Sequence, residues 1–206
     1  GLGSADDAER LRAVRYLAEH EARPDFFLAL TERISDVYDS VRFFALSALV
    51  KHYPAQLRAH ATRLVPLLME RLLDDNGTVT DRAIWALNIV GETALPHLLA
   101  ATESPQVRLR TMAAYALAHN HQMHAATSVA LPALLRLLDD ADEGVRFTAF
   151  CAVMDLTPLR PRTSLQAVDY EPIYARLLPL AEHFSRHHDA HMCEWAGCML
   201  ALLNNR

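Results

Sequence analysis

A short pattern recurs along the chain and constrains its fold more than any other feature. It consists of an apolar anchor, usually followed by Arg, with small Ala residues four and seven positions later and an apolar residue at position eight. The pattern is clearest at Val145-Arg146, which precede Ala149, Ala152 and Val153. Offsets of four, seven and eight share one face of an α-helix, and small side chains there let a neighbouring helix approach closely.

The pattern occurs several times, with successive anchors 30 to 47 residues apart. Thr80 replaces the Arg in the second copy, and the last copy is degenerate. The anchors are Val41, Val79, Leu109, Val145 and Met192. Repeats of this length are typical of helical solenoids, in which each unit buries its apolar face only against its neighbours.

A second apolar helix is expected upstream of most anchors, over residues 64–73, 95–101 and 131–138. Pro66, Pro96 and Pro132 are expected near the starts of these helices, where a missing backbone N–H costs little. Turns rich in Asp, Asn, Gly or Ser-Pro separate the two helices of each pair, at residues 36–40, 74–78, 104–105 and 139–144. We call the upstream helix A and the anchor helix B. The sequence thus predicts about five A–B pairs.

Residues 131–152 resemble a HEAT repeat, and about residues 25–155 share the resemblance, with a looser fit over residues 170–203. The resemblance implies an all-α fold, a right-handed α–α superhelix of the HEAT-like solenoid type. It also implies that turn Asp residues and the Arg after each anchor form a ladder between repeats. Arg42, Arg110 and Arg146 then have a structural role, and Thr80 interrupts the ladder.

One repeat domain is expected over residues 5–206. Within it, residues 5–22 are predicted to form an N-terminal capping helix. Residues 155–172 hold Pro158, Pro161 and Pro172 and do not fit the repeat, which indicates an inserted loop. Residues 1–4 read Gly-Leu-Gly-Ser and resemble a cloning remnant.

Composition excludes several function classes. The formal net charge is −5, which argues against an extended basic footprint for nucleic acid. Three scattered Cys predict no disulfide framework and favour a reducing, cytoplasmic setting. The sequence contains no run of 18 or more uncharged apolar residues, so no transmembrane helix is expected. No Gly-rich phosphate loop or Gly-x-Ser-x-Gly motif is present, so we expect neither an enzyme nor a cofactor.

Two groups of His stand out as candidate metal ligands. The first comprises His119, His121 and His124; the second comprises His183, His187, His188 and His191, beside Cys193 and Glu194. The spacing of His187, His191 and Glu194 could align three ligands on one helix face. A His-Glu-x-x-His motif is missing, and the two groups lie on different kinds of connection. We therefore expect the His residues of both groups to be polar loop residues that do not bind a metal ion.

The HEAT resemblance implies that the B helices line a concave surface. Positions two, three and six after each anchor should then point away from the A helices. Aromatic residues, Met and Arg are enriched there, as in binding hot spots, although packing between adjacent B helices is the alternative interpretation. The predicted partner-binding residues are Phe43, Phe44, Arg82, Trp85, Met112, Tyr115, Phe147 and Trp195.

The expected function is non-catalytic binding of a protein or peptide, as an adaptor, inhibitor or assembly factor, with the oligomeric state left open. A HEAT-scaffold enzyme or ligand binder is the alternative. A DNA glycosylase-like site could use Asp81 near Trp85, although the acidic balance opposes nucleic acid. A bilin lyase-like activity has no residue to support it. A deoxyhypusine hydroxylase-like di-iron site fails because His20-Glu21 is the only His-Glu pair.

Overall fold

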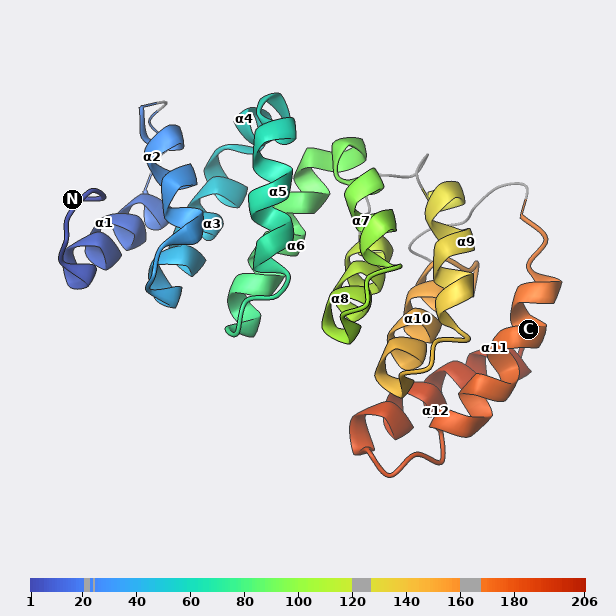
Figure 1. Cartoon of the computed structure of the whole chain (residues 1–206). Helices are drawn as coiled ribbons and strands as arrows, with labels where there is room; N and C mark the ends of the chain where they lie inside the picture. Colours follow the sequence, from blue (N-terminus) through green and yellow to red (C-terminus); the bar gives the residue numbers. More distant parts are fainter. Residues whose placement is uncertain (21–22, 24, 120–126, 160–167) are drawn as a thin grey trace. The chain divides into compact units, whose positions relative to one another are not determined.

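The computed structural model describes residues 1–20, 23, 25–119, 127–159 and 168–206 (Figure 1). The described residues form α-helices and two short 3-10 helices without any strand, which confirms the all-α prediction. The chain divides into two units, Gly1–Leu98 and Leu99–Arg206, and each is described by itself. His121, His124 and residues 160–167 of the predicted insertion, which include Pro161, lie outside the described part.

Unit 1 stacks three B helices, with α1 packed on α3 and α3 packed on α6. The A helices α2 and α5 pack against α3 and α6 respectively. The elements are α1 (Asp7–Glu19), α2 (Phe26–Glu32), η1 (Arg33–Ser35), α3 (Asp39–His52), α4 (Pro54–Ala59), α5 (Ala61–Arg71), α6 (Gly77–Val90) and η2 (Gly91–Thr93). The helix α7 (Leu95–Ala101) spans the boundary in sequence.

Unit 2 repeats the arrangement, with the B helix α8 packed on α10. The A helices α9 and α11 pack on α10, and α11 also packs on α12. The elements are α8 (Val107–Ala118), α9 (Thr127–Leu137), α10 (Glu143–Asp155), α11 (Glu171–Phe184) and α12 (Ala190–Asn204).

The small residues of the repeated pattern lie in the core as predicted. The Ala residues four and seven positions after the first four anchors are all buried: Ala45, Ala48, Ala83, Ala86, Ala113, Ala116, Ala149 and Ala152. Among the described helices, none alone is long and apolar enough to cross a membrane. Only Gly77–Thr93 and Leu95–Ala101 taken together across a bend reach that length and composition.

Two of the three prolines were predicted at the wrong place in their helices. Pro96 is the second residue of α7 as expected, but Pro66 and Pro132 lie inside α5 and α9. In α5 the helix begins a turn earlier because Ala61, Leu64 and Val65 are buried at helical spacing. That burial outweighs the one backbone hydrogen bond that an interior Pro removes.

Four of the six B helices, α1, α6, α10 and α12, begin with a side-chain cap. The cap side chains of Asp6, Asn76, Asp142 and Asp189 accept a hydrogen bond from a backbone N–H of the first helical turn. Two residues before the cap, a second side chain accepts the cap's own N–H. This second position is Asp74 in the α6 turn and Asp140 in the α10 turn, at 3.1 and 2.9 Å.

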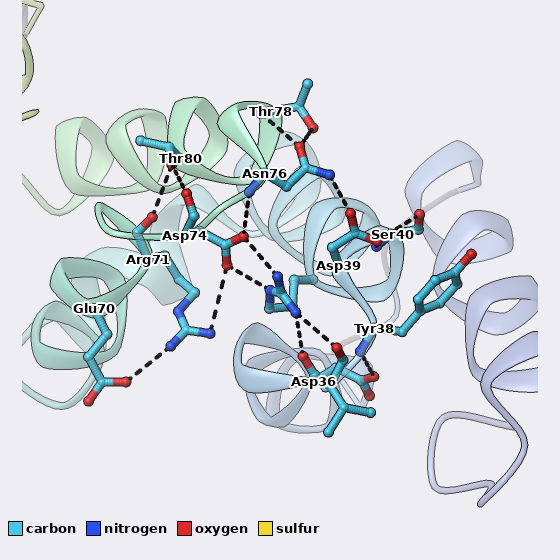
Figure 2. A network of polar contacts seen from close by, with 12 residues as sticks. Asp36, Tyr38, Asp39, Ser40, Glu70, Arg71, Asp74, Asn76, Thr78 and Thr80 are labelled. Carbon is cyan, nitrogen blue, oxygen red and sulfur yellow. Dashed lines mark hydrogen bonds and ion pairs between the residues drawn. The ribbon is translucent and has the colours of Figure 1, made fainter. Parts of the chain in front are cut away.

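An Arg four residues after the cap joins neighbouring repeats. Arg42 donates through Nε and Nη2 to both carboxylate oxygens of Asp74, at 2.7 and 2.8 Å. Its Nη1 donates to the backbone oxygen of Asp36 in its own turn, at 2.8 Å. Figure 2 shows Asp36, Asp74 and Asn76 gathered at this junction. Arg110 contacts Asp140 in the same way, at 2.7 and 2.8 Å, so the ladder role of both Arg residues is confirmed.

We call each bidentate Arg–Asp contact between repeats a rung of the ladder. The structure contains one rung that was not predicted and lacks one that was. Arg10 of α1 binds both carboxylate oxygens of Asp36, at 2.8 and 2.9 Å, and this rung was missed. Arg146 was wrongly assigned to a rung. Its Nη1 binds the backbone oxygen of Asp140 at 2.8 Å, but the corresponding position of the next turn holds His187, which offers no carboxylate.

The predicted break at Thr80 is confirmed. Its hydroxyl donates within its own repeat, to the backbone oxygens of Arg71 and Asp74 at 3.3 and 3.4 Å. The matching turn position of the following repeat is Ser104, so the sequence lacks both charges at this step. The missing rung coincides with the step at which the chain divides into two units.

The rungs hold their carboxylates ionised. The hydrogen bond from Arg110 lowers the pKa of Asp140, and this outweighs burial, which raises it. Burial is the largest influence on Asp74, yet the hydrogen bonds from Arg42 and the Asn76 N–H bring its pKa below the ordinary value. Each rung is therefore a desolvated ion pair with charge-assisted hydrogen bonds.

Replacing the Arg of a rung should destabilise unit 2 much more than replacing an Arg that forms no rung. We expect Arg110→Met to lower the free energy of unfolding by about 2–3 kcal/mol more than Arg146→Met, because only the first leaves a buried carboxylate without its partner. Both Arg residues donate to backbone oxygens of their own turns, so that shared contribution cancels. Urea unfolding followed by circular dichroism measures the difference. Equal losses would contradict the ladder.

The stability difference between wild type and Arg110→Met should depend on pH. A carboxylate whose pKa is depressed on folding stabilises the protein above its unfolded pKa, near 3.9, and loses that contribution as pH falls through the folded pKa. The difference should therefore be constant from about pH 5 to 7 and shrink below about pH 4. Urea unfolding at a series of pH values tests this, and a difference that persists to the lowest pH would exclude the ionised rung.

Candidate interaction surface

The B-helix face of unit 1 carries a stack of aromatic rings and guanidinium groups. The rings of Phe43 and Phe44 on α3 meet edge to face, with centroids 5.0 Å apart. The guanidinium carbon of Arg82 on α6 lies 5.6 Å from the Phe43 ring centroid and 5.5 Å from that of Trp85. Trp85 remains 58% exposed. Arg82 thus links α6 to α3 through its contact with Phe43, contacts Trp85 within α6, and leaves that indole open to solvent.

Arg15 extends this stack to α1, and the sequence reasoning missed it. Its guanidinium carbon lies 5.4 Å from the Phe44 ring centroid, and its side chain is exposed. The missed signal is the spacing from Asp6 to Arg10, which repeats the cap-to-Arg spacing of the other B helices and places Arg15 in register with Trp85. We call Arg15, Phe43, Phe44, Arg82 and Trp85 the cationic stack.

Unit 2 carries a pocket on the same face of its B helices. Its volume is about 340 Å³, and Tyr115 of α8 and Trp195 of α12 lie on its wall. These two side chains are 37% and 39% exposed. The polar part of the wall comprises His119, Thr148, Cys151, Asp155 and His191. The pocket therefore combines two aromatic surfaces with a carboxylate and two imidazoles.

The remaining predicted residues differ in their exposure. Met112 is half-buried in α8. Phe147 is only 7% exposed, which corrects the expectation that it points to an open surface. Its ring lies 5.1 Å from that of Phe184 on α11 and 6.4 Å from that of Phe150. Phe147, two residues after the anchor Val145, thus packs against the next A helix, α11, and contributes to the packing between repeats.

The second His group is organised around one carboxylate. The Nε2 atoms of His183 and His187 lie 2.8 and 3.3 Å from the two carboxylate oxygens of Glu143. Hydrogen bonding to His183 is the main cause of the lowered pKa of Glu143. His191 points elsewhere, toward Phe147 and Trp195. In the described part of the chain, no group of three or more His, Cys, Asp and Glu is arranged to hold a metal ion.

Comparison with known proteins finds a repeat family that resembles part of the chain. Residues 29–118 match the family model of HEAT repeats. No curated protein sequence matches the chain. This segment contains the Arg42 rung and the unit 1 aromatic residues of α3 and α6.

Solved helical-repeat structures share the fold at low sequence identity. The MAST/Orbit N-terminal domain is 15% identical, with a TM-score of 0.61 over 100% of this chain and 95% of that one. A chain from a structure of microtubule plus end tracking by XMAP215, CLIP-170 and EB1 is 16% identical, with a TM-score of 0.62 over 88% and 87%. A designed armadillo repeat protein in complex with the peptide (KR)4 is 20% identical, with a TM-score of 0.50 over 98% and 96%.

Truncating an exposed aromatic side chain should lower stability much less than truncating a buried one. We expect Trp85→Ala with Tyr115→Ala to keep the helical content and to cost less than about 1 kcal/mol per site, because both side chains keep a solvent-exposed surface and neither lies in the buried core. Phe147→Ala should cost about 3–5 kcal/mol, since it leaves a cavity against Phe184. Circular dichroism and urea unfolding report both quantities. Loss of folding in the double variant would mean that Trp85 and Tyr115 are core residues.

Proposed function

We propose that this HEAT-repeat chain is a non-catalytic interaction module that binds a protein or peptide on the B-helix face. The observation that carries the proposal is the shared register of Trp85 and Tyr115. Each stands nine residues after the cap of its B helix, and each is exposed. Within each unit, an exposed aromatic side chain lies on the same helix as Arg82 (unit 1) or Met112 (unit 2), residue types that are typical of binding hot spots.

HEAT and armadillo scaffolds commonly bind proteins or peptides, and two of the similar structures concern such partners. Packed helix pairs present their side chains in a preformed arrangement, so little ordering entropy is lost on binding. An adaptor, inhibitor or assembly factor needs such a surface and no catalytic group. The three free thiols fit a reducing, cytoplasmic setting.

The pocket of unit 2 supports a second candidate, a small-ligand site. Its volume of about 340 Å³ lies within the range of small-molecule sites, which combine apolar walls with a few polar groups. This is the form that the ligand-binding alternative takes, with Asp155, His119 and His191 as its polar groups. The DNA glycosylase-like alternative is weaker, because Asp81 is exposed on α6 and does not line this pocket.

Partner capture with matched variants tests the proposal. The immobilised protein is exposed to lysate of the source cells, the captured protein is identified, and its purified form is titrated by calorimetry. We expect Trp85→Ala with Tyr115→Ala to raise the Kd at least ~30-fold, because truncating one hot-spot residue costs about 2 kcal/mol or more.

Tyr38→Ala is the control, because Tyr38 is 41% exposed but lies in the turn before α3 and not on the B-helix face. The control should bind like the wild type. A partner that binds the folded double variant with unchanged affinity would exclude the B-helix face. Retention of a small molecule alone would favour the pocket of unit 2.

A further inference from the structure

We infer that the cationic stack of unit 1 binds an acidic peptide segment, whose carboxylates pair with Arg82 and Arg15 beside the exposed ring of Trp85. The inference rests on the proposed function and adds the chemistry of the partner. It follows from how these two guanidinium groups differ from those of the ladder residues Arg10 and Arg42.

The Arg residues of the ladder are already satisfied. Arg10 and Arg42 each bind both oxygens of an Asp from the following turn, and each also donates to backbone oxygens. Arg82 and Arg15 have no carboxylate partner among the described residues, and their contacts are with aromatic rings. Unit 1 therefore uses the same residue type in two ways, and only the second leaves hydrogen-bond donors for an external group.

Stacking prepares Arg82 for such a group. Phe43 and Trp85 both contact its guanidinium, which restricts the plane of the group but does not use its N–H donors. Its Nε is buried and has no hydrogen-bond acceptor among the described residues, so an external carboxylate would bind the two Nη groups. A partner carboxylate could accept two parallel hydrogen bonds from the fork, which is the geometry that Arg offers and Lys does not.

Charge complementarity selects the sign of the partner. The chain has a net charge of −5, yet Arg15 of α1 and Arg82 of α6, which contact the neighbouring rings Phe44 and Phe43 of α3, have no ion-pair partner among the described residues. Asp81 is exposed next to Arg82, but no ion pair joins them. A basic segment would add like charge, whereas carboxylates would neutralise both Arg residues. Trp85 offers an apolar surface for a neighbouring side chain of the same segment, so we specify a segment that combines acidic and aromatic residues.

Two cations are too few to hold an extended phosphate backbone, whose affinity grows with the number of phosphates neutralised. The exposed indole and the planar forks are better matched to a peptide with separate carboxylates. Single-stranded DNA is therefore included in the test as a competing occupant.

The experiment measures fluorescence anisotropy of three labelled probes on the full chain. The probes are a short peptide of Glu flanking Phe, the same peptide with Lys in place of Glu, and an oligothymidine. We expect the acidic peptide to bind at least about tenfold more tightly than the basic one, with an affinity that falls as salt is added.

Charge-matched variants locate the contact. Arg82→Gln should weaken the acidic peptide about tenfold, and Arg82→Lys should restore only part of the loss, because it keeps the charge but not the planar fork. Arg63→Gln removes one exposed Arg from the A helix α5 and should have little effect. Circular dichroism confirms that each variant is folded.

The inference is overturned if the acidic peptide does not bind, if Arg82→Gln and Arg63→Gln behave alike, or if oligothymidine or the basic peptide binds more tightly. Its failure can be told apart from failure of the proposed function. A captured partner that is lost with Trp85→Ala and Tyr115→Ala, but is indifferent to Arg82→Gln and Arg15→Gln, would keep the binding module and remove the acidic-segment inference.

Discussion

The bidentate contact between an Arg of one repeat and an Asp of the next is the interaction on which the rest of each unit depends. It joins two B helices at their starts, and the Arg simultaneously ties its own turn through backbone oxygens. The same Asp accepts the N–H of the cap residue that begins the next helix. One rung therefore sets where a B helix starts and how it is rotated against its neighbour. A buried carboxylate that needs several donors at once tolerates few other arrangements.

In every B helix a side chain two residues before the cap accepts the N–H of the cap residue, so positions counted from the cap can be compared between repeats. The ninth residue after the cap is Arg15, Ser47 and Trp85 in unit 1, and Tyr115, Cys151 and Cys198 in unit 2. The Ala residues four and seven positions after the first four anchors are all buried, whereas this position varies in size and charge. Within one helix, some positions pack in the core, and the ninth position after the cap is available to contact a partner. That separation explains how one scaffold can present a cationic stack in unit 1 and an aromatic-lined pocket in unit 2.

The helix pairs, the buried Ala positions, two rungs and the break at Thr80 were predictable, because they follow from local periodicity and a repeated Arg. The Arg10 rung was missed because Glu9 stands where the other repeats have an apolar anchor. Arg146 was misassigned because its partner position lies in a distant turn, where His187 replaces Asp. Phe147 and Trp85 both occupied predicted surface positions, yet α11 covers only the first. The periodicity of a single helix cannot reveal which neighbour covers it.

A double-mutant cycle on Arg42 and Asp74 tests the ladder most directly. Their side chains are only 13% and 3% exposed, whereas those of the comparison pair, Arg136 and Glu103, are 62% and 71% exposed. The free energies of unfolding of the single and double Ala variants give a coupling energy for each pair. The ladder predicts a coupling of about 2–3 kcal/mol for Arg42 with Asp74 and less than about 0.5 kcal/mol for the exposed pair. Equal, small couplings would show that helix packing alone sets the register, and would contradict the account.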